Sequence, residues 1–211
     1  MGWEADILLY IQEHIRSDFF NPVMTVFTHT GDYGIFVMAL AAVLLILPRT
    51  RKTGIIAATS IALEALLTNV LIKNLVARTR PYDAIEGLEN LIEKQKDFSF
   101  PSGHTGSAFA VMGAIFLVAV LGLPAIAKTG EFKRIKTSRT FKIWAVIAIV
   151  YAVILGFSRL YVGVHYPTDV IGGLLLGVVT SFIAYFLFRA GLKIYFNKKA
   201  KKEAESNTQD T

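Results

Sequence analysis

The most constraining feature of this chain is a series of long apolar segments. Crossing the hydrocarbon core of a bilayer, which is about 30 Å thick, takes roughly 20 apolar residues of α-helix. Five segments reach or approach that length: 31–47, 54–72, 104–127, 142–157 with an extension toward 162, and 169–188. The whole chain is 54% hydrophobic and only 18% charged, which is too apolar for an ordinary soluble domain. The sequence therefore predicts an all-α protein, a polytopic transmembrane helical bundle with five spans.

The segments on either side of these spans differ from them in character. Residues 1–30 are apolar on one face and carry charges on the other, which is typical of an amphipathic helix in the membrane interface; a sixth span is the alternative. The segment lacks the basic start of a cleavable signal peptide, so we expect it to be retained. Residues 31–190 form the expected membrane core, and 191–211 a disordered basic tail with too few apolar residues to order itself.

The positions of Lys and Arg predict the orientation of the spans, because short cytoplasmic loops are enriched in these residues. Under strict alternation, the basic segments 48–53, 128–142 and 193–202 fall on one side, which we expect to be cytoplasmic together with the C-terminal tail. These segments hold most of the excess behind the formal net charge of +6, so we expect membrane lipids and not nucleic acid as partners. No obligate protein partner is indicated.

The opposite, outward side also contains cations, and these need another explanation. Lys73, Ala77 and Arg80 have the spacing i, i+4 and i+7 in a segment that Pro81 closes. On a helix both cations would therefore lie on one face and point to one spot. Taken alone, they are also explained as two side chains that snorkel at a membrane boundary.

A second outward segment precedes a long apolar helix. Pro101 and Ser102 are typical of residues at a helix N-terminus, and Gly103 allows the backbone to approach a ligand closely. The free N–H groups of such an end bind anions, and His104 lies at the same place. A capped helix with an interfacial histidine is the alternative.

The third outward segment pairs a histidine with a carboxylate. Arg159 precedes His165, and Asp169 follows that histidine by four residues. With Pro167 at the first helical position, Asp169 lies one turn from His165 and can hold one imidazole nitrogen while the other stays free. A histidine held in this way is a base or a nucleophile in catalytic triads, although a local hydrogen bond at a helix start is an equal alternative.

Together the three segments favour chemistry over coincidence. Two histidines, three cations and a helix N-terminus lie at the predicted outward ends of different spans. Phosphoryl transfer needs such groups, because the equatorial oxygens carry negative charge into the transition state. The carboxylates do not cluster as Mg²⁺ or Zn²⁺ ligands would, and the chain has no cysteine, so neither a metal nor another cofactor is expected.

These segments resemble the three signature motifs of the type 2 phosphatidic acid phosphatase superfamily, a family of integral membrane lipid phosphatases. The motifs K-x6-RP, PSGH and SR-x5-H-x3-D occur in order and without substitution. They include Pro81, Pro101 and Ser158 as structural positions. The resemblance covers about residues 31–190 and implies a multi-pass bundle; together with the orientation predicted from Lys and Arg, it predicts an active site on the outer side of a cell membrane.

The resemblance also implies a role for each matching side chain. The chain would be a metal-independent hydrolase in which His165 attacks phosphorus to form a phosphohistidine, Asp169 orients its ring, and His104 protonates the leaving oxygen. The phosphoryl oxygens would be held by five residues: Lys73, Arg80, Ser102, Gly103 and Arg159.

The expected substrate is a lipid phosphate or pyrophosphate. An outward site in a bacterial cell membrane favours undecaprenyl pyrophosphate, with phosphatidylglycerol phosphate and phosphatidic acid as alternatives. A lipid phosphotransferase would use the same motifs with another acceptor. An anion transporter would explain the cations but leaves His165 and Asp169 without a role, and the intact histidines argue against an inactive scaffold.

Two further features lie outside the motifs. Glu64 is near the middle of the segment 54–72, where we expect a neutral or hydrogen-bonded structural role with Thr68 or Asn69. The connection 82–97 has apolar residues at near-helical spacing, which predicts a short amphipathic helix that is either a lid or a connector. His14 and His29 have no motif around them and are expected to be interfacial.

Overall fold

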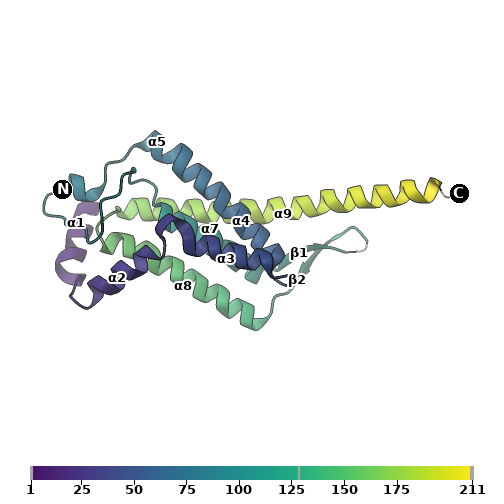
Figure 1. The fold of residues 1–211 in the computed structure, drawn as a ribbon, viewed down its shortest axis with the longest axis horizontal. Coiled ribbons are helices and arrows are strands. Elements are labelled where there is room, and N and C mark those ends of the chain that lie inside the picture. The colour runs from purple at the N-terminus through teal and green to yellow at the C-terminus, as the bar shows by residue number, and fades with distance from the viewer. Residues whose placement is uncertain (1, 128, 210–211) are drawn as a thin grey trace.

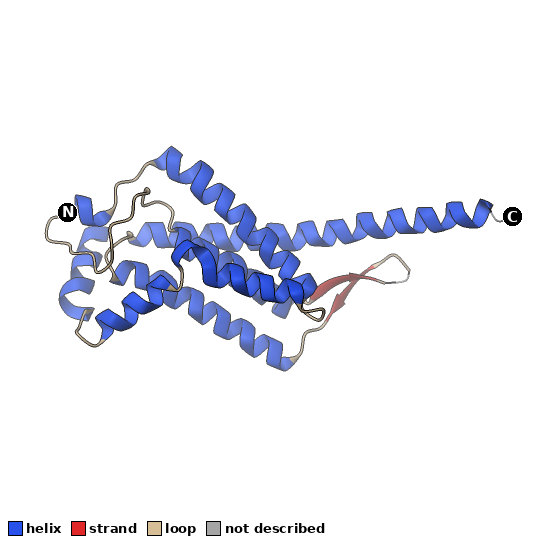
Figure 2. Ribbon diagram, viewed as in Figure 1, coloured by secondary structure: helices blue, strands red, loops and turns tan. Residues whose placement is uncertain are grey.

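The computed structural model describes residues 2–127 and 129–209. Within these residues the chain is mostly helical, with one β-hairpin at an end of the bundle (Figures 1 and 2). The elements in chain order are α1 Trp3–Tyr10, η1 Ile11–Ile15, α2 Phe20–His29, η2 Asp32–Gly34, α3 Ile35–Ile46, α4 Arg51–Ala65, η3 Leu66–Ile72, α5 Lys73–Val76, α6 Pro81–Ala84, α7 Gly103–Leu121, β1 Leu123–Ile126, β2 Phe132–Ile135, α8 Arg139–Tyr161 and α9 Pro167–Gln209.

Helix α7 forms the centre of the bundle and packs against α4, α8 and α9. In the apolar 18-residue stretch of this helix, 78% of the residues are buried, whereas the share is 28% to 33% in the other long spans. Glycines allow α9 to approach it closely: a Cβ at Gly173 would lie 2.4 Å from the Ser102 carbonyl oxygen, and one at Gly177 2.5 Å from that of Gly106. These contacts hold the start of α9, and with it the third motif, directly against the second motif.

Among the described residues, four helical segments are long and apolar enough to cross a membrane: Arg51–Ala84, Gly103–Leu121, Arg139–Tyr161 and Pro167–Lys202. Helices α2 and α3 give a fifth span if they are counted as one, with a bend of 44° between them. The prediction of an all-α, multi-pass membrane bundle is therefore confirmed, with four or five spans.

The N-terminal part of the bundle differs from the predicted boundaries. Residues 31–47 were expected to form one span, but α3 has only 12 residues. Tyr33 and Gly34 have φ angles of 53° and 66°, and this left-handed turn separates α3 from α2. Helix α1 lies across the end of the bundle, so the first thirty residues combine a capping helix with part of a bent span (Figure 1).

Two other boundaries also differ. Helix α7 ends at Leu121 and not at 127, because Gly122 adopts a φ of 82° and the next residues pair in the antiparallel hairpin of β1 and β2. At the C-terminus, α9 continues as helix to Gln209, through most of the segment 191–211 whose composition predicts disorder; residues 210 and 211 lie outside the described residues. That segment contains no proline and no glycine after Gly191, so nothing in its composition stops a helix.

The connection between α6 and α7 is irregular, and the predicted amphipathic helix is not formed. Leu88 is buried against Leu8 and Tyr166, and the Leu91 N–H donates to the Val162 carbonyl oxygen at 3.0 Å. The apolar residues of this connection therefore attach it to α1 and to the α8–α9 turn.

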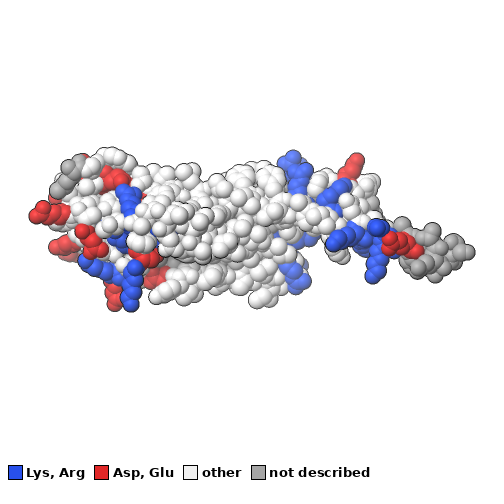
Figure 3. Space-filling model, turned by 90° about the horizontal axis from the view of Figure 1, so that it is seen from above, with Lys and Arg blue, Asp and Glu red and all other residues white. Residues whose placement is uncertain are grey.

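Charged residues gather at the two ends of the molecule, with an uncharged band between them on the face that Figure 3 shows. The α3–α4 turn, the β-hairpin and the C-terminal part of α9 lie at one end, so the three basic segments share a side as predicted (Figure 1). Helix α1 and the three motifs lie at the other end.

Candidate active site

Lys73 and Arg80 meet at one carboxylate. Helix α5 ends before Ala77, which is left-handed with a φ of 49°, and Arg80 is extended because it precedes Pro81. The chain thereby turns back, and the Lys73 ammonium and the Arg80 Nη2 both donate to the carboxylate of Asp97, the latter at 2.7 Å. The expectation that both cations point to one spot is confirmed, but the continuous helix it assumed is wrong.

Asp97 was not among the predicted site residues. Burial would raise the pKa of Asp97, but the Lys73 ammonium and the Arg80 guanidinium outweigh it and lower that pKa to about 2. The carboxylate is therefore charged at neutral pH. It binds the two cations that the family resemblance would assign to a phosphate.

The second motif forms the N-terminus of α7. The Ser102 Oγ accepts hydrogen bonds from the Thr105 N–H at 3.4 Å and the Thr105 hydroxyl at 2.9 Å, which makes Ser102 the N-cap. Its own N–H donates to the Asp169 carbonyl oxygen at 3.0 Å. A Cβ at Gly103 would lie 3.8 Å from the Lys73 Nζ, so the anion-binding end of α7 faces a cation.

His165 lies in the turn between α8 and α9 and is only 1% exposed. Its Nε2 is 3.2 Å from the Arg80 Nη1, and its Nδ1 is 3.4 Å from the Asp169 Oδ2. Because a guanidinium only donates, Nε2 accepts and Nδ1 carries the proton that faces the carboxylate. Burial lowers the pKa of His165 to about 3, despite the hydrogen bond with Asp169, which raises it. At neutral pH the ring is thus uncharged, and the electron pair of Nε2 points toward Arg80.

Arg159 is also almost completely buried. Its Nη1 donates to the Thr28 hydroxyl at 2.6 Å, whereas its Nε has no hydrogen-bond partner within the described part of the chain. A buried guanidinium N–H without an acceptor is costly, and a phosphoryl oxygen would satisfy it.

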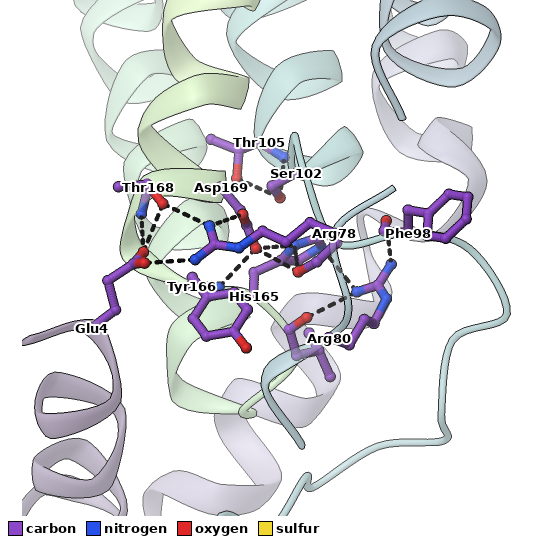
Figure 4. A network of polar contacts seen from close by, with 12 residues as sticks. Glu4, Arg78, Arg80, Phe98, Ser102, Thr105, His165, Tyr166, Thr168 and Asp169 are labelled. Carbon is purple, nitrogen blue, oxygen red and sulfur yellow. Dashed lines mark hydrogen bonds and ion pairs between the residues drawn. The ribbon is translucent and has the colours of Figure 1, made fainter. Parts of the chain in front are cut away.

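The carboxylate of Asp169 is fully buried and saturated with donors (Figure 4). Its Oδ1 accepts from the Arg78 Nη1 at 2.7 Å, and its Oδ2 accepts from the Ser99 hydroxyl at 2.5 Å and the Tyr166 N–H at 2.9 Å. Arg78 in turn donates from Nη2 to Glu4 of α1 at 2.5 Å. Neither Glu4 nor Ser99 was predicted, because neither is a specified position of a motif, although Ser99 lies two residues before Pro101.

The three motif residues expected to be structural lie around this network. Pro81 is the first residue of α6, Pro101 follows a cis peptide bond just before α7, and the Ser158 hydroxyl donates to the Leu155 carbonyl oxygen at 2.7 Å.

A cavity of about 1180 Å³ opens beside these groups. Six of the residues that line it are Asp32, Glu64, Lys73, Asp97, Gly103 and His104. His165, Arg80 and Arg159 do not line it and are exposed by 5% or less. Asp97 thus lines the cavity and binds Arg80, the residue that contacts the buried His165.

Glu64 supports the first turns of α7 from below. It is 2% exposed, and its Oε1 accepts from the Thr68 hydroxyl at 2.6 Å, which confirms the expected hydrogen bond. A Cβ at Gly106 would lie 2.1 Å from the same oxygen, so the glutamate packs directly against the turn that follows His104.

A membrane bundle that buries an uncharged histidine among cations has the groups that chemistry on phosphate needs. Known proteins agree with this assignment. The sequence pattern of the PAP2 superfamily matches residues 53–192. An undecaprenyl-diphosphatase from Sulfolobus acidocaldarius is 35% identical over 145 residues, which cover 69% of this chain and 60% of that relative. Phosphatidylglycerophosphatase B from Bacillus subtilis is 33% identical over 172 residues, which cover 80% of this chain and 75% of that relative.

A solved structure shows the same fold. The crystal structure of a transmembrane PAP2 type phosphatidylglycerolphosphate phosphatase from Bacillus subtilis has a TM-score of 0.64 and 30% identity, over 86% of this chain and 82% of that one. The chain therefore belongs to the PAP2 superfamily.

Proposed function

We propose that this protein hydrolyses a lipid phosphate or pyrophosphate through a phosphohistidine on His165. The observation that carries the proposal is the environment of that imidazole. One nitrogen faces Asp169 and the other faces Arg80, and burial keeps the ring uncharged at neutral pH. This is the state in which a histidine is a nucleophile.

In the first half of the reaction, the electron pair on the His165 Nε2 forms a bond to phosphorus while the bond from phosphorus to the leaving lipid oxygen breaks. His104 transfers its proton to that oxygen. In the second half, water attacks phosphorus, the P–N bond breaks and its electrons return to Nε2, while His104 takes a proton from the water. Phosphate leaves, and both histidines are restored.

The cations supply the electrostatic part of catalysis. Lys73, Arg80 and the free Nε of Arg159 would hold the phosphoryl oxygens, with the N-terminus of α7 and the Ser102 hydroxyl completing the cradle. A phosphate must first take the place of the Asp97 carboxylate on Lys73 and Arg80.

The proposed substrate class follows from the position of the site. The cavity lies at an end of a membrane bundle, where a lipid headgroup meets water. Relatives include an undecaprenyl-diphosphatase and a phosphatidylglycerophosphatase, so we propose a polyprenyl pyrophosphate first and phosphatidylglycerol phosphate second. The basic segments at the other end favour a site on the outer side of the cell membrane.

The decisive experiment is phosphate release by the detergent-purified protein, with EDTA present, from undecaprenyl pyrophosphate, phosphatidylglycerol phosphate and phosphatidic acid. We expect His165→Ala to lose activity by about 10³-fold or more, as for other nucleophiles. His14→Gln, which changes an exposed histidine of η1, is the matched control. Unchanged release by His165→Ala would refute the phosphohistidine, and release that requires an added alcohol acceptor would show a phosphotransferase.

A further inference from the structure

We propose that Asp32 is a positioning residue for His104, an inference that rests on the proposed function. Asp32 begins η2, between α2 and α3, and lies outside residues 53–192, which the PAP2 pattern matches. Its carboxylate bridges two histidines. Oδ1 is 2.9 Å from the His104 Nε2, and Oδ2 is 2.6 Å from the Nδ1 of His29.

The contact determines which nitrogen of His104 can exchange a proton with the substrate. A carboxylate only accepts hydrogen bonds, so the His104 Nε2 that faces Asp32 carries a hydrogen. Nδ1 is then the nitrogen left for catalysis. In the protonated ring, Nδ1–H donates to the leaving oxygen; in the neutral ring, the bare Nδ1 accepts a proton from water. Asp32 therefore selects the tautomer that both halves of the reaction need.

The backbone around Asp32 is shaped to hold the ring. A Cβ at Gly31 would lie 2.6 Å from the His104 Cδ2, so the turn packs directly against the imidazole. The left-handed residues Tyr33 and Gly34 follow at once and form the bend between α2 and α3. This bend, which breaks the predicted span, is what brings the Asp32 carboxylate to the site.

Exposure and charge agree with a working role. The His104 side chain is 15% exposed and that of Asp32 36%, and both line the cavity. Lys73, which lines the same cavity, and the buried Arg159 both repel a protonated imidazole, whereas the Asp32 carboxylate attracts it. Glu64 also lines the cavity but is held by Thr68, so Asp32 is the anion that hydrogen-bonds this ring.

Asp32→Asn tests the proposal, because an amide preserves the shape of the side chain but no longer enforces one tautomer. For phosphatidic acid, whose alkoxide leaving group needs a proton, we expect kcat to fall about 10- to 100-fold, part of the usual effect of general acid catalysis, with little change in KM. For p-nitrophenyl phosphate, whose leaving group departs without a proton, we expect a retained burst of nitrophenol followed by slow turnover, because only the water step is impaired. A purely structural role would lower the burst and the turnover alike, which would overturn the proposal.

Two control variants and one further measurement complete the design. Asp18→Asn changes an exposed aspartate of the same N-terminal region and should leave the activity on both substrates unchanged. Asp32→Glu restores a carboxylate and should recover part of the lost kcat. If Asp32→Asn does not fold, nitrogen NMR of His104 in the wild-type protein decides: a hydrogen on Nε2 and none on Nδ1 supports the proposal, and the opposite tautomer refutes it.

The same assay separates this inference from the proposed function. A wild-type protein without phosphatase activity would refute the proposed function itself. An active wild type that loses activity in His165→Ala but keeps it in Asp32→Asn would refute only the role of Asp32.

Discussion

At the scale of single residues, Asp97 binds the two cations that the proposed phosphate would bind, so we expect the two anions to compete. The carboxylate binds Lys73 and Arg80 and is charged at neutral pH, because the pKa of Asp97 is lowered to about 2. Removing its charge should therefore favour a phosphate. We expect Asp97→Asn to bind inorganic phosphate about tenfold more tightly, which corresponds to about 1.4 kcal/mol.

Product inhibition measures this effect. The inhibition constant of inorganic phosphate should fall in Asp97→Asn and stay constant in Asp18→Asn, which changes an exposed aspartate that does not line the cavity. An unchanged or higher inhibition constant in Asp97→Asn would mean that the carboxylate does not compete with phosphate.

The buried state of His165 makes stability depend on pH. Its pKa is about 3 in the folded protein, so between this value and the ordinary value near 6.5 the unfolded chain binds a proton that the folded protein does not. The contribution of His165 to the free energy of unfolding is therefore at its maximum above about pH 6.5, and it decreases as the pH falls toward 3. We expect wild type to lose about 2 kcal/mol more than His165→Gln between pH 7 and pH 5. If the free energies of unfolding of the two proteins changed by the same amount between pH 7 and pH 5, the prediction would be contradicted.

The motifs predicted which side chains meet at this end of the bundle far better than they predicted the partners that hold those side chains in place. The side chains of the three motifs meet at one end of the bundle, as their shared sidedness indicated. Glu4, Thr28 and Asp32, which bind Arg78, Arg159 and His104, could not be predicted. These partners are distant in sequence, and single polar residues in an amphipathic segment look like ordinary interfacial groups.

At the scale of elements, Arg78 joins α1 to the start of α9. It binds Glu4 on one side and Asp169 and Thr168 on the other, and it stacks on the Tyr166 ring at 3.8 Å. Without this guanidinium, Asp169 would keep fewer donors and hold His165 less firmly. We expect Arg78→Met to lower kcat about 10- to 100-fold with a smaller change in KM, since proton transfer and orientation depend on placement.

Two matched variants test that expectation in the phosphate-release assay. Arg78→Lys should recover only part of kcat, because an ammonium cannot bind two carboxylates through a planar fork. Arg49→Met, which removes an exposed arginine at the opposite end of the bundle, should have no effect. A rise in KM alone would instead assign Arg78 to substrate binding.

Hydropathy predicted the existence of the elements better than their ends. The segments 142–162 and 169–188 correspond closely to α8 and to the apolar part of α9, because long apolar runs leave little choice in a membrane. The misplaced ends lie at single residues with unusual backbone angles, namely Gly34, Ala77 and Gly122. The glycine at position 122 was a visible signal for a helix end. Ala77 gave no such signal, since alanine is the best helix former and adopts a left-handed angle here only under tertiary constraint.

At the scale of the whole molecule, the distribution of charge predicts how the bundle lies in the membrane. One end carries the α3–α4 turn, the hairpin and the basic C-terminal part of α9 (Figures 1 and 3), and residues of the first and second motifs, at the other end, line the cavity. The basic end should be cytoplasmic, which places the cavity outside. Because the chain has no cysteine, single introduced thiols can report this directly.

We therefore expect Glu93→Cys, at an exposed position that lines the cavity, to react with a membrane-impermeant maleimide in intact cells. Lys133→Cys, at an exposed position on β2, should react only after the membrane is permeabilised. The unmodified chain is the blank, because it offers no thiol. The reverse labelling pattern would place the site on the cytoplasmic side. The site would then have to receive its lipid phosphate from the inner leaflet. That result would argue against a substrate presented from outside.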